Sequence, residues 1–214
     1  MIAETVLEPP AQEVEENAKC RQVIEGARKI FLARGFDAAS MGDIAKAAGV
    51  SKGTLYVYFK DKDELFAALM KKECLFQAED VFIFDPADAD IAGTLTRLGV
   101  TYVSRVCEPG RQLPLRTVVA IADRMPNIGR IFYENGPLVG ISKLRAYLEA
   151  QVAAGRLRVR DCEVAAAQLM EAYLATLFKP LLFNFAPPPT RERIEYVVGL
   201  AVEDFMAAHA SAVS

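Results

Sequence analysis

Residues 40–66, SMGDIAKAAGVSKGTLYVYFKDKDELF, constrain the fold more than any other part of the chain. Helical spacing of the apolar residues predicts two short helices, over 40–48 and 51–58, before a third helix that starts at Asp61. The tight turn between the first two is expected at Gly49, because glycine can take the positive φ that such a turn needs. This segment therefore predicts a helix-turn-helix arrangement.

The second of these helices is expected to present a polar face. Ser40 and Ser51 are placed as N-caps of the two helices. Leu55 and Phe59, four residues apart, point inward. The outward positions carry a lysine, a hydroxyl group and two phenols, on Lys52, Thr54, Tyr56 and Tyr58. An ordinary solvated face is one interpretation, and a DNA duplex is the other, since lysine and tyrosine bind phosphates and a threonine can contact a base edge.

The distribution of charge favours an anionic partner for this segment. The net charge of the whole chain is −3, and residues 1–17 hold five acidic residues and no basic one. Residues 18–73 carry 11 Lys and Arg against seven Asp and Glu. The positive charge thus coincides with the helix-turn-helix, as attraction to phosphate requires. The acidic start is expected to form a disordered tail over 1–17.

The run GVSKGTLYVYF closely resembles the helix-turn-helix of the tetracycline-repressor (TetR) family. The resemblance extends back through CRQVIEGARKIFLARGFDAA (20–39) and forward through KDKDELF (60–66). The later part of the chain is similar to the AefR-like regulators of that family, in LGVTYVSRVCEPG (98–110), MPNIGRIFYENGP (125–137) and YLEAQVAAGRLRVRD (147–161). The resemblance implies an all-helical homodimer that binds a palindromic operator and represses until a small molecule releases it.

The resemblance also implies which residues contact DNA. These lie at the start of the first helix, along the second helix and at the start of the third: Ser40, Ser51, Lys52, Gly53, Thr54, Tyr56, Val57, Tyr58 and Lys62. The expected organisation is a DNA-binding domain over 18–66 and a ligand-binding and dimerisation domain over 67–211.

About nine helices are expected in all. Beside the three described above, the pattern predicts helices over 17–34, 88–107, 111–123, 125–154, 161–180 and 190–208. Pro137 must kink the helix over 125–154 or restart it, because proline lacks the amide hydrogen and clashes with the preceding turn.

The last two predicted helices are candidates for a dimer interface. Between Val164 and Phe178 the only charge is Glu171, so this helix must be buried on more than one side. Either it is the centre of a monomeric core, or two copies of both helices pack as a four-helix bundle. The residues expected at the seam are Ala165, Leu169, Ala172, Ala175, Ile194, Val197, Val198, Ala201 and Phe205.

A ligand cavity is implied by the resemblance, within the helices between the DNA-binding segment and the dimer helices. The candidates for its lining are mostly aromatic and aliphatic: Phe76, Tyr102, Val103, Val106, Arg116, Val119, Met125, Phe132, Tyr133, Glu171, Tyr173 and Leu177. Such residues at helical spacing are also what an ordinary core contains. With few ionisable groups among them, the expected effector is apolar.

Other functional classes have less support. The only histidine is His209, and the chain has no Walker A loop, nucleophile elbow or paired metal ligands, so we expect neither an enzyme nor a metal or other cofactor. Charge or proline interrupts every apolar stretch before it reaches membrane-spanning length. Without an export signal the protein is expected in the cytoplasm. The alternatives are a helical ligand sensor that does not bind DNA, and an activator of the same family.

Overall fold

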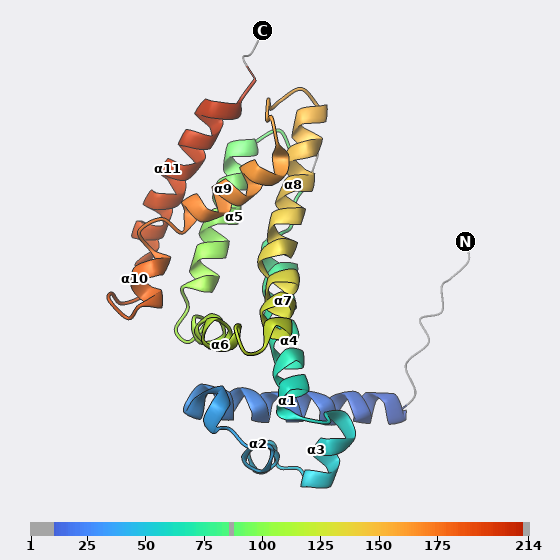
Figure 1. Ribbon diagram of the computed structural model, residues 1–214. Coiled ribbons are helices and arrows are strands. Elements are labelled where there is room, and N and C mark those ends of the chain that lie inside the picture. Colours follow the sequence, from blue (N-terminus) through green and yellow to red (C-terminus); the bar gives the residue numbers. More distant parts are fainter. Residues whose placement is uncertain (1–10, 86–87, 212–214) are drawn as a thin grey trace, which may run out of the picture. The chain divides into compact units, whose positions relative to one another are not determined.

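The computed structural model describes residues 11–85 and 88–211, without the side chains of residues 11–17 and 73–80. The described residues form helices joined by turns, and their only strand-like pairing is an isolated bridge between Leu157 and Ala210. The predicted all-α fold class is confirmed. The chain divides into two compact units, Met1–Met70 and Lys71–Ser214, whose helices are labelled in Figure 1.

The first unit contains α1 (Ala11–Ala38), α2 (Met41–Ala48), α3 (Lys52–Tyr58) and the start of α4 (Lys62–Val81). At Gly35, where the sequence predicts the end of the first helix, α1 is broken by a non-helical φ of 74° and ψ of 174°.

The start of α1 corrects one prediction. Residues 11–17, assigned from the sequence to a disordered tail, form the first turns of this helix. The composition of that stretch, with alanine, glutamine and three glutamates, has high helix propensity. Residues 1–10 of the predicted tail lie outside the described residues.

An aromatic cluster and a close helix contact hold the first unit together. The rings of Phe31, Phe36 and Phe66 pack with centroids 5.0 to 5.6 Å apart. α1 approaches α2 closely at Gly26, where an added Cβ would lie only 2.6 Å from the Cβ of Ala48. This packing gives α2 and α3 a fixed support.

The second unit contains the rest of α4 and seven further helices. Their bounds are α5 (Ile91–Val106), α6 (Leu113–Ile121), α7 (Pro126–Asn135), α8 (Pro137–Ala153), α9 (Cys162–Tyr173), α10 (Phe178–Leu182) and α11 (Arg191–His209). α9 packs against α8, α5 and α11, and α5 packs against α11 (Figure 1). No helix in the described ranges is both long enough and apolar enough to cross a membrane.

Two predicted helices are each divided, so the described residues hold eleven helices where about nine are expected. Pro137 restarts the helix over 125–154 as α8. The single helix predicted over 161–180 is wrong, because α9 ends at Tyr173 and α10 starts at Phe178. The sequence signal for this break is Pro180, whose ring would clash with the carbonyl of Thr176 in a continuous helix. Thr176 instead takes a left-handed φ of 60°.

The core of the second unit is centred on Tyr173 of α9. Its ring is fully buried, and its hydroxyl donates a hydrogen bond of 2.9 Å to the carbonyl of Leu95 in α5. Gly99 lets the helices approach there, since a Cβ at that position would lie 2.6 Å from Val198 and 2.8 Å from the Tyr173 ring. This close packing joins α5, α9 and α11 (Figure 1).

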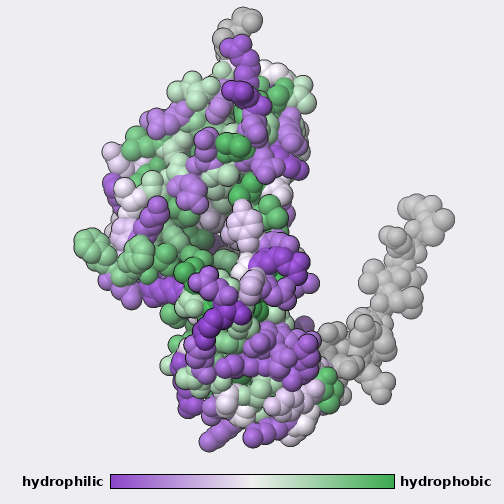
Figure 2. Space-filling view, in the orientation of Figure 1, coloured by the Kyte–Doolittle hydropathy of each residue, from purple (hydrophilic) through white to green (hydrophobic). Residues whose placement is uncertain are grey.

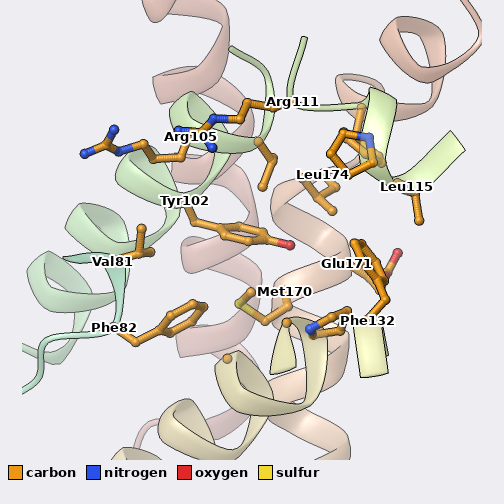
Figure 3. Close-up of a pocket in the computed structure, with 16 residues that line it drawn as sticks. Val81, Phe82, Tyr102, Arg105, Arg111, Leu115, Phe132, Met170, Glu171 and Leu174 are labelled. Atoms are coloured by element: carbon orange, nitrogen blue, oxygen red, sulfur yellow. The ribbon is translucent and has the colours of Figure 1, made fainter. Parts of the chain in front are cut away.

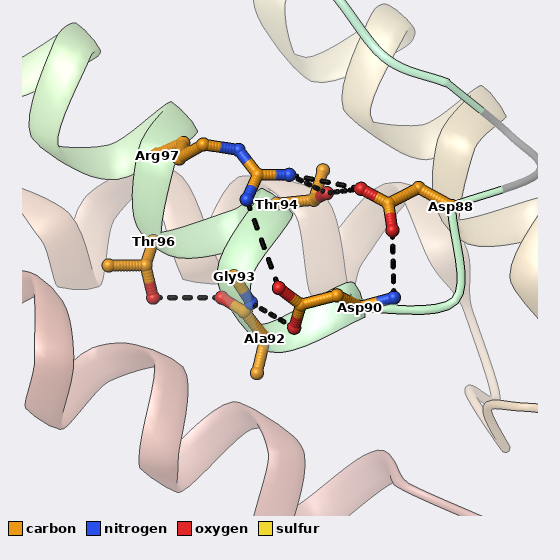
Figure 4. A network of polar contacts seen from close by, with 7 residues as sticks. All are labelled: Asp88, Asp90, Ala92, Gly93, Thr94, Thr96 and Arg97. Atoms are coloured by element: carbon orange, nitrogen blue, oxygen red, sulfur yellow. Dashed lines mark hydrogen bonds and ion pairs between the residues drawn. The ribbon is translucent and has the colours of Figure 1, made fainter.

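A polar network fixes the entry to α5 (Figure 4). The carboxylate of Asp90 accepts from the amide of Gly93 as an N-cap, and the carboxylate of Asp88 accepts from the Thr94 hydroxyl and from Arg97. The pKa of Asp88 lies below its usual value, chiefly because its carboxylate accepts a hydrogen bond from the Asp90 amide. Thr94 and Arg97 lower it further. These caps explain why α5 begins at Ile91 rather than at the predicted residue 88.

Candidate nucleic-acid interface and ligand cavity

Local capping forms the helix-turn-helix. The amide of Asp43 donates to the Ser40 hydroxyl oxygen at 3.1 Å, and the amide of Thr54 donates to the Ser51 hydroxyl oxygen at 3.0 Å. Gly49 ends α2 with a left-handed φ of 67°. The helix bounds therefore agree with the predictions over 40–48 and 51–58, to within one residue.

The outward face of α3 carries the predicted polar and aromatic groups. Lys52 and Gly53 are exposed, and 53% of Tyr56 and 76% of Val57 is exposed. Thr54 and Tyr58 are half-buried, and the Thr54 hydroxyl shares a 2.8 Å hydrogen bond with Ser51. These groups lie on one short helix that buried Leu55 and Phe59 anchor in the first unit, and Lys52, Gly53, Tyr56 and Val57 form its accessible part.

Lys52 reaches back over the start of α2. Its Nζ lies 3.2 Å from the position that a Cβ on Gly42 would take, so this glycine makes room for the lysine side chain. The ammonium group is thereby close to the amino-terminal end of α2, where unpaired backbone amides carry partial positive charge. Together they form a positive region suited to a phosphate group.

Ser40 and Asp43 lie at the same helix start, where the Ser40 hydroxyl oxygen is 3.7 Å from the same Cβ position on Gly42. The Ser40 hydroxyl donates to Asp43 at 2.7 Å, and Arg34 pairs with Asp43 at 3.1 Å. These contacts, the Ser40 hydrogen bond foremost, hold the pKa of Asp43 below its usual value. Ser40 itself is exposed, as a phosphate contact requires.

The structure gives Lys62 a different role from the predicted phosphate contact. Its ammonium group donates to the carbonyls of Phe36 at 2.7 Å and Ala39 at 3.1 Å. It also lies 4.4 Å from the centroid of the Phe36 ring, in cation–π contact. These interactions stabilise the carboxyl end of α1, where helix carbonyls lack partners and attract positive charge. Lys62 is therefore a structural residue.

A cavity of about 230 Å³ lies within the second unit. Its lining comes from the segment at the end of α4 and from α5 to α10: Val81, Phe82, Tyr102, Arg105, Val106, Arg111, Pro114, Leu115, Phe132, Gly136, Pro137, Gly140, Met170, Glu171, Leu174 and Phe178. In Figure 3 the hydroxyl of Tyr102 points across the cavity toward the side occupied by Glu171, while the side chain of Arg105 extends away.

Four predicted ligand residues line this cavity: Tyr102, Val106, Phe132 and Glu171. Val103, Tyr173 and Leu177 are buried in the core, Val119 and Tyr133 are exposed, and Met125 is half-buried outside the lining. The guanidinium group of Arg116 instead donates to the carbonyls of Leu181 and Leu182 and to the side chain of Asn184. The side chain of Phe76 lies outside the described residues.

Phe82 and Met170 are the clearest lining residues that the sequence analysis missed. Phe82 follows the last residue of α4 and packs on Tyr102, with ring centroids 6.0 Å apart. Its ring also occupies the space beside Gly140, where a Cβ would lie 2.6 Å from it. A glycine facing an aromatic ring leaves no periodic signal in a sequence, so this contact could not be predicted.

The predicted dimer residues mostly face their own subunit. Seven of them are buried in the core of the second unit: Ala165, Leu169, Ile194, Val197, Val198, Ala201 and Phe205. Ala172 is half-buried and Ala175 is exposed. The stripe on α11 is apolar because it packs on α5 and α9 of the same chain, so it is not the surface that a partner would meet.

Other apolar residues form the outward surface of these helices. Half of Val164 in α9 is exposed, as are 59% of Tyr196 and 45% of Leu200 in α11. Phe183 and Phe185, in the segment after α10, are the most exposed phenylalanines among the described side chains. Figure 2 shows hydrophobic residues projecting at the left edge, where Figure 1 places this segment.

Two family models match the chain. Residues 23–69 match the model of bacterial regulatory proteins of the tetR family, and residues 93–211 match the C-terminal domain of AefR-like transcriptional repressors.

Curated relatives match over about a third of this chain or less. The HTH-type transcriptional repressor Rv1474c of Mycobacterium tuberculosis is 37% identical over 65 residues, which is 30% of this chain and 35% of that protein. The regulator AcrR of Shigella flexneri is 40% identical over 58 residues, 27% of this chain and 26% of the relative. The matched region is thus about a third or less of the length of either relative.

Solved structures match almost the whole chain. A TetR-family regulator from Mesorhizobium loti MAFF303099 has a TM-score of 0.85 at 26% identity, covering 92% of this chain and 98% of the other. The flavonoid-responsive regulator FrrA has a TM-score of 0.81 at 32% identity, covering 92% of this chain and all of the other.

Proposed function

The chain belongs to the TetR family of DNA-binding transcriptional regulators, which are not enzymes, and we propose that it is a repressor released from a palindromic operator by an apolar effector. The observation that carries this proposal is the exposed Lys52/Tyr56 face of α3, supported from behind by buried Leu55 and Phe59. Repression is favoured over activation because the curated relatives Rv1474c and AcnR are named as transcriptional repressors. Such a regulator acts where the chromosome lies, in the cytoplasm.

α3 is the proposed recognition helix. Lys52 and the amide groups at the start of α2 bind one phosphate group. Tyr56 and Tyr58 make further contacts with the phosphate backbone of the DNA. Val57 is exposed enough to contact a thymine methyl group. The Thr54 hydroxyl can contact a base edge once its hydrogen bond with the Ser51 hydroxyl is broken. Lys62 is left out of this interface because its ammonium group is bound to the end of α1.

An electrophoretic shift assay with the DNA upstream of the protein's own gene tests this interface. The wild-type protein should retard that fragment, and the Lys52/Tyr56/Tyr58 triple alanine variant should not. Alanine at Lys72, a lysine in α4 outside the proposed face, is the control for the general effect of lost charge. Full affinity in the triple variant would remove α3 from the recognition surface.

Dimerisation through α9 and α11 supplies the symmetry that a palindrome requires. A two-fold dimer places two recognition helices on one face of the duplex, one helical turn or a multiple apart. The residues proposed to meet the partner are the exposed apolar ones, Val164, Tyr196 and Leu200, with Ala172 and Ala175 at the edge. They replace the core residues suggested by the sequence pattern.

The cavity in the second unit is the proposed effector site. Its lining is rich in aromatic and aliphatic side chains, which favour an apolar ligand. FrrA, 32% identical, is by its name flavonoid-responsive, which supports an aromatic effector for this chain as well. Phe132 and Met170 would contact its rings, with Tyr102 and Glu171 as polar partners.

α4 is the proposed connection between the effector site and the operator. The boundary between the two units falls within this helix, which starts four residues after α3 ends, and its last residue, Val81, lines the cavity. A ligand that binds better to the released state weakens operator binding by a coupling free energy of about 1–3 kcal/mol. By linkage, operator DNA must weaken ligand binding by the same factor, which calorimetry with and without operator measures.

A further inference from the structure

The charges that line the cavity restrict the chemistry of the ligand. Glu171 supplies a carboxylate on one side, and Arg105 and Arg111 supply guanidinium groups elsewhere in the lining. Both arginines also lie beside Glu108, at 3.7 and 3.3 Å. A buried anion would meet the Glu171 carboxylate, and the guanidinium groups would have to leave Glu108 to compensate it, which is unfavourable. A buried cation could pair with Glu171, but this residue is exposed to water, so its carboxylate compensates only part of the cost of burying the cation. An uncharged ligand avoids both costs.

Tyr102 and Glu171 are the polar lining side chains that do not lie beside Glu108. Burial, with the nearby Glu171 charge as a lesser cause, raises the pKa of Tyr102 to about 12. Tyr102 therefore stays a neutral hydroxyl that can donate or accept, whereas an ionised carboxylate only accepts. A ligand that pairs with both must itself carry a hydrogen-bond donor.

The size and shape of the cavity add a third restriction. A cavity of about 150 Å³ holds a single benzene ring, so about 230 Å³ corresponds to two fused rings. Phe82, Tyr102, Phe132 and Phe178 line it with aromatic surface, which favours a flat aromatic body over a flexible chain.

We propose that Glu171 and Tyr102 select a neutral, hydroxylated aromatic ligand of about two rings, with the ligand hydroxyl donating to the Glu171 carboxylate. This inference rests on the proposed effector site and adds the residues that set its specificity. Tyr102 orients the hydroxyl from the other side of the cavity, and the surrounding aromatic side chains contact the rings.

Four matched naphthalene probes test the selection by calorimetry on the full-length protein at pH 7. The probes are 2-naphthol, 2-methoxynaphthalene without a donor, 2-naphthoate as the anion and 2-(aminomethyl)naphthalene as the cation. We expect 2-naphthol to bind about tenfold more tightly than the methoxy compound, as one charge-assisted hydrogen bond implies. The anion and the cation should bind more weakly than 2-naphthol.

Two variants assign the selection to residues. Glu171→Gln should weaken 2-naphthol about tenfold, leave 2-methoxynaphthalene unchanged and improve 2-naphthoate. Tyr102→Phe should weaken 2-naphthol by a smaller factor, because the lost hydrogen bond is between neutral groups. Glu134→Gln, which changes an exposed glutamate of α7 outside the lining, is the control and should match wild type.

Several outcomes would overturn the inference. They are equal affinity for 2-naphthoate and 2-naphthol, equal affinity for the methoxy compound, unchanged selectivity in Glu171→Gln, and no binding of any probe by the wild-type protein. The affinities of the four probes for the wild-type protein test the selectivity even if a variant does not fold. Operator binding is measured separately without probe, so failure of the proposed regulator function is distinguishable from failure of this selectivity.

Discussion

Substitution of Gly26 by alanine is expected to disturb the DNA-binding unit from its interior. An added Cβ would lie 2.6 Å from the Cβ of Ala48, 2.7 Å from its amide nitrogen and 2.8 Å from its Cα. Ordinary contact begins at 3.4 Å, so α1 and α2 must separate by roughly 0.6–0.8 Å. Two of the three atoms belong to the backbone of α2, which cannot move aside as a flexible side chain would.

The magnitude follows from two opposing effects. Alanine gains about 1 kcal/mol over glycine through helix propensity. Forcing a methyl group into a packed contact costs about 1–3 kcal/mol, toward the upper end when backbone must shift. The separation also strains the 2.7 Å hydrogen bond from the Gln22 amide to the Ala48 carbonyl. We therefore expect Gly26→Ala to lose about 1–2 kcal/mol of stability in this unit.

Hydrogen exchange resolved to single amides measures this loss of stability within the first unit. In Gly26→Ala the slow amides of α1 and α2 should exchange about tenfold faster, since 1.4 kcal/mol is a factor of ten. The matched control is Gly129→Ala in α7, where the new Cβ would lie 3.6 Å from Ala122, an ordinary contact. That variant should gain about 0.5–1 kcal/mol. Equal or slower exchange in Gly26→Ala would refute the reasoning about this contact.

Three further predictions concern the proposed sites. Lys52→Ala should weaken binding to every DNA sequence and reduce the slope of log affinity against log salt by about one unit, as titrations at several salt concentrations would show. Leu200→Asp should give a monomer by light scattering, whereas Ile83→Asp, an exposed apolar position outside α9 and α11, should leave the dimer intact. Gly140→Ala should push the Phe82 ring into the cavity and weaken probe binding by calorimetry, while leaving operator affinity in the absence of ligand unchanged.

The helix-turn-helix could be predicted from the sequence because its determinants are local. Ser40 and Ser51 cap helices whose amides lie within three residues of them, and Gly49 supplies its own positive φ. Each of these interactions depends only on residues that are close together in the sequence. The contacts of Lys62 could not be predicted for the opposite reason, because its partners lie 23 to 26 residues earlier in the chain.

The cavity and the dimer surface depend on tertiary packing, which periodicity does not encode. The apolar stripe of α11 correctly indicates burial but not whether the same chain or a partner covers it. Likewise Val103 and Tyr102 are adjacent apolar positions of α5, yet Val103 lies in the core and Tyr102 in the cavity lining. Pro180 indicates the break before α10. The largely uncharged composition of the segment instead suggests one continuous buried helix.

The proposed function depends most on the binding of two copies of α3 to a two-fold symmetric duplex. Selection of binding sites from random double-stranded DNA with the wild-type protein tests this directly. We predict enrichment of an inverted repeat with half-site centres one helical turn or a multiple apart, and no enrichment with the Lys52/Tyr56/Tyr58 triple alanine variant. Recovery of no sequence, or of a single asymmetric site, would contradict the account.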